Sequence, residues 1–211
     1  MPQAYPIVTG NVLDKKAVRH PLERRAVAAF DRRLSELVRG LAPRRVVEIG
    51  CGEGNVAALV KVVLPGCYYA AADIDAELLE ETAARGADRT VLIDPEGPLR
   101  LPFPDRDFDL ALLIEVLEHV PRPEPMLAEA ARLARSAIAS VPFEPWWRMV
   151  NVLRFRYLSR LGNTPGHLNH WGRAGLRRLV GGWFCIERVE TSFPWLIAVA
   201  GPQAAPDARH D

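Results

Sequence analysis

Short apolar runs alternate with amphipathic stretches through most of the chain. The apolar runs are rich in Val, Ile, Leu and Ala, which predicts buried strands, whereas apolar positions three and four residues apart predict helices. The predicted strands span 44–50, 67–74, 90–94, 107–115 and 136–143, and the predicted helices span 21–40, 55–64, 75–86, 123–134 and 172–182. Strands separated by such helices imply a parallel sheet covered on both faces.

The alternation changes near the C-terminus. Residues 184–201 read FCIERVETSFPWLIAVAG, which predicts two strands joined by a tight turn. Two strands this close in sequence pair antiparallel. The chain is therefore expected to form an α/β fold of the Rossmann-like, doubly wound type, mostly parallel, with an antiparallel hairpin at its end.

Composition and charge narrow the class of protein. Hydrophobic residues make up 49% and charged residues 25% of the 211 residues, as in a soluble globular domain. The 27 basic and 26 acidic residues give a net charge of +1, so no nucleic-acid partner is expected. No apolar stretch approaches the ~18 residues of a spanning helix, and the start lacks an apolar signal core. Three scattered cysteines fit a reduced, cytoplasmic protein.

A glycine-rich loop follows the first predicted strand. VVEIGCGEGN places Gly50, Gly52 and Gly54 between a strand and a helix, where backbone amides can approach a ligand closely. The dinucleotide fingerprint needs its third glycine one position later, where Asn55 stands. Glu48, two residues before the loop, would repel a pyrophosphate but would attract a cofactor with an ammonium and a sulfonium. A tight turn without a ligand is the simpler alternative.

Acidic residues stand at the ends of the next two predicted strands. Asp73 falls where a carboxylate can accept hydrogen bonds from both ribose hydroxyls of a nucleoside. Asp94 follows the third strand and is placed to reach an adenine amino group. Asp75 is expected to cap the helix that starts beside it. Each acid alone fits a capping or solvated role, but together with the loop they indicate a nucleoside site.

These segments carry a resemblance. VVEIGCGEG, AADIDAELLEE and LPFPDRDFDLALLIEVLEHVPRPEPMLAEAARLAR are similar to class I S-adenosylmethionine-dependent methyltransferases, in particular the ubiquinone/menaquinone-type group, over roughly residues 40–200. The resemblance implies a seven-stranded sheet whose last strand is inserted antiparallel. It also implies S-adenosylmethionine as the cofactor. The implied cofactor contacts are Glu48, Gly50, Cys51, Gly52, Gly54, Asp73, Ile74, Asp94 and Glu115.

The stretch IEVLEHV, residues 114–120, has three interpretations. One helical turn would place Glu115, Glu118 and His119 on a shared face. In the first interpretation Glu115 lies beside the methionine part of the cofactor, and Glu118 and His119 begin a helix that shapes the substrate pocket. In the second, His119 is a general base. In the third, the block resembles metal-dependent small-RNA 2′-O-methyltransferases and binds a divalent metal together with His170.

An insertion between the fifth strand and the last helix is expected to select the substrate. Residues 143–171 mix aromatic and arginine residues, and a plain crossover needs far less chain. The segment is expected to form a helical lid over an apolar, partly cationic pocket. A helix packed on the core and an interfacial helix that meets a membrane are the alternatives. His167 and His170 lie at its end and, with His119, are the candidate catalytic bases.

The sequence therefore predicts an enzyme that methylates an oxygen or nitrogen atom of a small molecule, such as a secondary metabolite. No metal is expected, although the RNA-directed, metal-dependent reaction stays an alternative. A scaffold that binds the cofactor and activates a partner subunit is the non-enzyme alternative. A single domain is expected over 1–204, with a helical cap at 1–40, the lid at 143–171 and a flexible tail at 205–211. The sequence does not indicate an oligomeric state.

Overall fold

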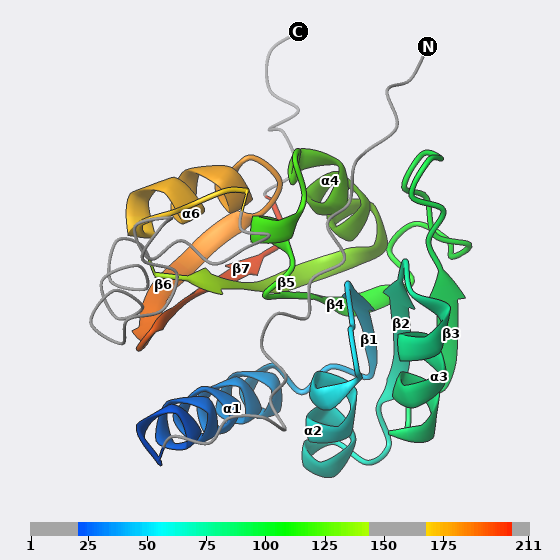
Figure 1. Cartoon of the computed structure of the whole chain (residues 1–211). Helices are drawn as coiled ribbons and strands as arrows, with labels where there is room; N and C mark the ends of the chain where they lie inside the picture. Colours follow the sequence, from blue (N-terminus) through cyan, green and yellow to red (C-terminus); the bar gives the residue numbers. More distant parts are fainter. Residues whose placement is uncertain (1–20, 144–167, 204–211) are drawn as a thin grey trace, which may run out of the picture.

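The computed structural model describes residues 21–143 and 168–203, and Figure 1 shows their arrangement. The helices and strands, in chain order, are α1 (Pro21–Leu41), β1 (Arg45–Ile49), α2 (Asn55–Val63), β2 (Tyr68–Asp73), α3 (Ala76–Ala84), β3 (Arg89–Leu92), β4 (Phe108–Ile114), the 3₁₀ turn η2 (Leu117–His119), α4 (Glu124–Leu133), β5 (Ala134–Pro142), α6 (Arg173–Gly181), β6 (Cys185–Ser192) and β7 (Trp195–Gly201).

The strands form one seven-stranded sheet in the order β3-β2-β1-β4-β5-β7-β6. β1 to β5 pair in parallel, whereas β7 is inserted antiparallel between β5 and β6. The strand order reverses between β1 and β4. In open parallel sheets of this kind, a ligand binds at the carboxyl ends of the strands beside that reversal.

Helices cover both faces of the sheet (Figure 1). α1, α2 and α3 pack on one face, over a core that includes Phe30, Tyr69 and Ile197. α4 and α6 pack on the other face, over a core that includes Leu113 and Leu127. Because both faces are covered, the central strands are mainly apolar rather than alternating, and every residue of β7 is buried.

Local signals in the sequence explain several element boundaries. Asp75 caps α3, since its side chain accepts hydrogen bonds from the backbone amides of Glu77 and Leu78. Pro21 begins α1, where its missing N–H has no helical partner to lose. Pro65 and Gly66 follow α2 and stop it.

The fold class predicted from the sequence is confirmed, including the antiparallel hairpin within 184–201. The third strand was predicted over 90–94 but spans Arg89–Leu92. Of the predicted lid, residues 144–167 lie outside the described residues, as do the first part of the N-terminal cap and the tail. Within the described ranges, no helix has the length and apolar character needed to cross a membrane.

Candidate functional site

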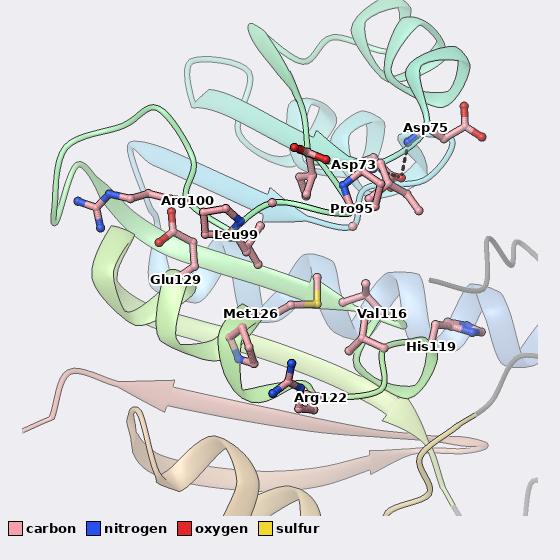
Figure 2. Close-up of a pocket in the computed structure, with 18 of the residues that line it drawn as sticks. Asp73, Asp75, Pro95, Leu99, Arg100, Val116, His119, Arg122, Met126 and Glu129 are labelled. Atoms are coloured by element: carbon pink, nitrogen blue, oxygen red, sulfur yellow. Dashed lines mark hydrogen bonds between the residues drawn. The ribbon is translucent and has the colours of Figure 1, made fainter. Parts of the chain in front are cut away.

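A cavity of about 820 Å³ opens at the carboxyl ends of the parallel strands. Its wall includes Gly50 and Gly52 after β1, Asp73 at the end of β2, Asp94 after β3 and Glu115 after β4. Figure 2 shows His119 at one end of this wall, Arg100 and Glu129 at the other, and Val116 and Met126 between them. A volume of this size is typical of a small-molecule or cofactor site.

The glycine loop bends sharply against the turn that follows β4. Gly50, Gly52 and Gly54 all have positive φ angles, a region that residues with a Cβ rarely adopt. A Cβ on Gly50 would lie 2.3 Å from Cγ2 of Val116, and one on Gly54 would lie 2.7 Å from the Cα of Thr82. Gly50 and Gly54 therefore allow the loop to pack closely against Val116 and Thr82. The loop contributes Gly50 and Gly52 to the cavity wall.

Replacing Gly50 by Ala should destabilise the fold by about 1–2 kcal/mol, because an L-residue is strained at its φ of 82°. The contact with Val116 adds to this cost. The double variant Gly50→Ala/Val116→Ala relieves the contact but leaves the strain, so it should recover part of the loss. Urea denaturation of the two variants and of Val116→Ala measures the difference. If the losses of unfolding free energy in Gly50→Ala and Val116→Ala simply add up in the double variant, the two residues are not coupled, and the contact with Val116 does not contribute to the cost.

Asp73 ties the loop after β1 to the loop after β2. Its carboxylate accepts hydrogen bonds from the backbone amides of Gly52 (2.8 Å), Ile74 (2.7 Å) and Asp75 (3.2 Å). Ionised carboxylates form strong hydrogen bonds with backbone N–H groups, so one side chain fixes both loops. Oδ1 accepts the bonds from Ile74 and Asp75, whereas Oδ2 accepts only the bond from Gly52. A lone pair therefore remains on Oδ2, with which Asp73 can also accept a bond from a ligand in the cavity.

The turn after β4 differs from the predicted helical turn. Glu115 has a φ of 56°, which breaks a helix at that position, and only Leu117–His119 form a short 3₁₀ turn. Consequently Glu115, Glu118 and His119 do not share a face. Glu115 and His119 line the cavity, whereas Glu118 is 2% exposed and points into the interior. The expectation that Glu118 shapes the pocket beside His119 is therefore wrong.

Glu118 is an unusual buried acid. Its Oε2 accepts no hydrogen bond within the described part of the chain. Burial raises the pKa of Glu118 well above its ordinary value, and the nearby charge of Glu115 raises that pKa further. The charged form of Glu118 is thus disfavoured in this interior position.

The chain that follows the insertion returns to the same turn. The backbone amides of Leu168 and Asn169 both donate to the carbonyl oxygen of Glu118, and Nδ2 of Asn169 donates to the carbonyl of Val120 at 2.7 Å. His170, next in sequence, is exposed and does not line the cavity. His167 lies outside the described residues. Of the three candidate bases, the described chain places only His119 on the cavity wall.

The remaining predicted cofactor residues divide into two groups. The first group lines the cavity and consists of Gly50, Gly52, Asp73, Ile74, Asp94 and Glu115. Glu48, Cys51 and Gly54 lie behind the wall and are buried. The side chain of Glu48 accepts a hydrogen bond from the hydroxyl of Tyr69 at 2.6 Å, and burial is the main cause that raises the pKa of the Cys51 thiol.

The cavity also has walls that the sequence interpretation did not include. Glu53 from the glycine loop, Leu99 and Arg100 from the loop after β3, and Arg122 and Met126 around the start of α4 all line it. Glu53 stands between Gly52 and Gly54, so its place on the cavity wall could have been predicted from the sequence. The others required knowledge of how the loop after β3 folds onto α4.

The wall residues suit a cationic nucleoside. The acids that line the strand ends are Glu53, Asp73, Asp75, Asp94 and Glu115. They offer acceptors for hydroxyl and amino donors and a negative potential for a positive charge. Gly50 and Gly52 let backbone come close, and Ile74 and Ile93 offer apolar surface for a base. S-adenosylmethionine, which combines ribose, adenine, an ammonium and a sulfonium, fits this donor and acceptor set.

The arrangement offers less to a metal ion. Among residues 21–143 and 168–203, no group of three or more His, Cys, Asp and Glu side chains is placed to hold one. Of the E-x-x-E-H block, Glu115 and His119 line the cavity, whereas Glu118 is buried behind its wall.

Comparison with known proteins identifies the domain type. Residues 47–137 match the family described as a methyltransferase domain. Ajmaline N-methyltransferase of Rauvolfia serpentina is 32% identical over 99 residues, which cover 44% of this chain and 33% of that protein. Fatty-acid O-methyltransferase of Mycolicibacterium smegmatis is 29% identical over 92 residues, 44% of this chain and 34% of that protein. The chain spans about a third of the length of these curated relatives.

Solved structures support the same fold. The magnesium protoporphyrin IX methyltransferase of Synechocystis PCC 6803, solved with bound S-adenosylhomocysteine, superposes with a TM-score of 0.62. It is 18% identical, over 87% of this chain and 88% of that one. An S-adenosylmethionine-dependent methyltransferase of Aquifex aeolicus has a TM-score of 0.55 and 16% identity, over 74% of this chain and 81% of that one. At these identities the likeness concerns the fold.

Proposed function

We propose, from the premise that this chain belongs to the class I S-adenosylmethionine-dependent methyltransferases, that it methylates an oxygen or nitrogen atom of a small molecule. One observation carries the proposal: the glycine loop and Asp73 form the wall of one cavity, at the strand reversal where this fold binds its ligand. Relatives that are named as N- and O-methyltransferases support both acceptor atoms.

The proposed cofactor site uses the strand-end residues. Asp73 would hold the ribose and Asp94 would face the adenine, with Ile74 and Ile93 against the base. Glu115 would lie near the methionine end, where its charge favours an ammonium. S-adenosylmethionine, when bound there, supplies an activated methyl group. The chain then has to align the acceptor with that group, which is the main source of acceleration in a displacement with an activated donor.

His119 is the proposed base for an acceptor that must lose a proton. It lines the cavity beyond Val116, on the short turn held by Leu168 and Asn169. A neutral imidazole can accept a proton near pH 7. The substrate class, a small molecule rather than RNA, and the cytoplasmic location stay proposals. The metal-dependent alternative gains no support from the described side chains.

Two measurements on the whole chain test the proposal. Isothermal titration calorimetry should detect binding of both S-adenosylmethionine and S-adenosylhomocysteine, with affinities that fall when Asp73 is replaced. A panel of small hydroxyl and amine acceptors should yield S-adenosylhomocysteine, without stimulation by manganese and without inhibition by EDTA. Absence of binding would contradict the cofactor assignment. Binding without transfer, together with a stable co-purifying subunit, would favour the scaffold alternative. Transfer to RNA that needs a metal would favour the RNA-directed alternative.

A further inference from the structure

The turn that carries His119 is held by two residues that lie far from it in the sequence. The backbone amides of Leu168 and Asn169 donate to the carbonyl oxygen of Glu118 at 2.8 and 3.3 Å. The side-chain amide Nδ2 of Asn169 donates to the carbonyl oxygen of Val120 at 2.7 Å. These hydrogen bonds fix the carbonyl groups on either side of His119, which lies at one end of the cavity wall (Figure 2).

The turn itself supplies little to hold its own backbone. Its 3₁₀ part, Leu117–His119, is three residues long, and the amide of His119 donates to the carbonyl of Val116 at 3.1 Å. Val120 is extended, and Pro121 after it has no N–H to donate. Because hydrogen bonds in 3₁₀ turns have poor geometry, the bonds from outside the turn have a large part in fixing where its backbone lies.

The segment that carries Asn169 is itself fixed on the core of the domain. Trp171, two positions later, forms a parallel β-bridge with Phe143, which follows β5 directly. The amide of Phe143 donates to the carbonyl of Pro194 at 2.9 Å. The ring of Trp171 packs so closely on α6 that a Cβ on Gly175 would lie 3.1 Å from its Cδ1. Asn169 therefore joins the turn to a segment that is fastened to β5 and α6.

Asn169 does not line the cavity, so it can act on a substrate only through the turn. We propose that Asn169 is a positioning residue, whose side chain sets the place of His119 against the acceptor atom by holding the carbonyl of Val120. This inference rests on the proposed function, in which His119 is the base. As the acceptor atom bonds to the methyl carbon, the carbon–sulfur electron pair stays on sulfur and the proton of the acceptor moves to His119. Such a step depends on alignment, and a misplacement of about 1 Å can lower its rate on the order of a hundredfold.

Asn169→Asp separates the hydrogen bond from the shape of the side chain. A carboxylate has nearly the same size as the amide, but it donates no hydrogen bond and repels the carbonyl oxygen of Val120. With the panel of hydroxyl and amine acceptors, Asn169→Asp and Asn169→Ala should both lower kcat on the order of tenfold or more. The Kd of S-adenosylhomocysteine, measured by calorimetry on the full chain, should stay close to the wild-type value in both variants.

Gln203→Ala is the matched control for the loss of a side-chain amide. Gln203 also donates its amide to a backbone carbonyl, that of Gly182 at 3.3 Å, and neither residue lines the cavity. Its kcat and its Kd should therefore stay unchanged. A wild-type kcat in Asn169→Asp, or an equal loss of kcat in Gln203→Ala, would overturn the inference.

A double variant distinguishes positioning of the base from a general structural role. If Asn169 acts through His119, then Asn169→Ala should add nothing to the loss of kcat in His119→Ala. Losses that multiply in the double variant would show that Asn169 acts elsewhere, and would overturn the inference. If Asn169→Asp does not fold, Asn169→Ala decides the question, and the reverse holds.

A spectroscopic measurement on the full chain needs no acceptor. The NMR signal of the proton on Cε1 of His119, identified by its absence in His119→Gln, should shift or broaden in both Asn169 variants and stay in place in Gln203→Ala. An unmoved signal in both Asn169 variants would overturn the inference. Absence of cofactor binding by the wild-type chain, or full activity of His119→Ala, would instead contradict the proposed function, so the two failures are distinguishable.

Discussion

Replacement of Asp73 by Ala is expected to weaken binding of S-adenosylmethionine and S-adenosylhomocysteine equally, by about 10- to 100-fold. The carboxylate accepts three backbone N–H groups from the two loops that frame the cavity, those of Gly52, Ile74 and Asp75. Its loss removes the proposed ribose acceptor and leaves the loops without their common anchor. Hydrogen bonds to a charged acceptor contribute roughly 1.5–3 kcal/mol each, which corresponds to this range of affinity.

Calorimetry with both ligands measures the effect, and Asp75→Ser is the matched control. Asp75 lines the cavity and caps α3, and a serine retains the capping oxygen. Its ligand affinities should stay within a few-fold of wild type. Asp73→Asn should be intermediate, since its amide oxygen accepts some of these bonds without a charge. Unchanged affinity of Asp73→Ala for both ligands would mean that the ribose assignment is wrong.

Most of the sheet could be predicted because its central strands are covered on both faces. Strands in that setting are mainly apolar, and the helices between them have a clear period of three to four residues. Some bounds differed by two residues: β5 starts at Ala134 rather than 136, and the edge strand β3 ends at Leu92 and not at Asp94. Its sole partner is β2, whose last paired residue is Asp73, opposite Leu92. Ile93 still donates its backbone N–H to the carbonyl oxygen of Asp73 at 2.8 Å, but the paired strand does not extend to Asp94.

The candidate site was predictable where it depends on topology. Parallel strands end at one edge of the sheet, so the acid that ends β2 and the acid that follows β3 are brought to the same cavity as the glycine loop. Side-chain direction was harder to predict. Glu48 and Val46 point to the sheet face that α1, α2 and α3 cover, whereas Val47 and Ile49 point to the opposite face. The pairing of Glu48 with Tyr69 depends on the register of β1 against β2, which the sequence does not specify.

The turn after β4 shows the limit of spacing arguments. Spacings of three and four bring residues together only if every intervening residue is helical. The left-handed backbone of Glu115 breaks that condition, and Glu118 turns inward. Pro121 and Pro123 indicate in the sequence that a helix does not run through this stretch, because the residue before a proline disfavours the helical conformation. The helix therefore begins only at Glu124.

Replacement of Glu129 by Ala is expected to destabilise the fold by about 3–5 kcal/mol, the usual cost of removing one partner of a buried ion pair. Glu129 is 5% exposed and accepts two hydrogen bonds from Arg132 and one of 2.7 Å from the backbone amide of Leu101. Arg132 in turn donates to the carbonyls of Leu101 and Phe103 and to Asp105. The pair thus fastens the stretch LPFPD to α4 and closes one end of the cavity.

Without Glu129, the buried amide of Leu101 loses its acceptor and Arg132 loses its most buried counter-ion. Urea denaturation should report this loss, and Glu187→Ala is the matched control, because Glu187 is 47% exposed and its ion pair with Arg188 is 3.6 Å long. That control should cost less than about 1 kcal/mol. Glu129→Gln keeps an acceptor for Leu101 but removes the charge, so it should fall between the two. A Glu129→Ala variant as stable as Glu187→Ala would mean that solvent replaces the pair, and that the LPFPD stretch is held by its apolar side chains alone.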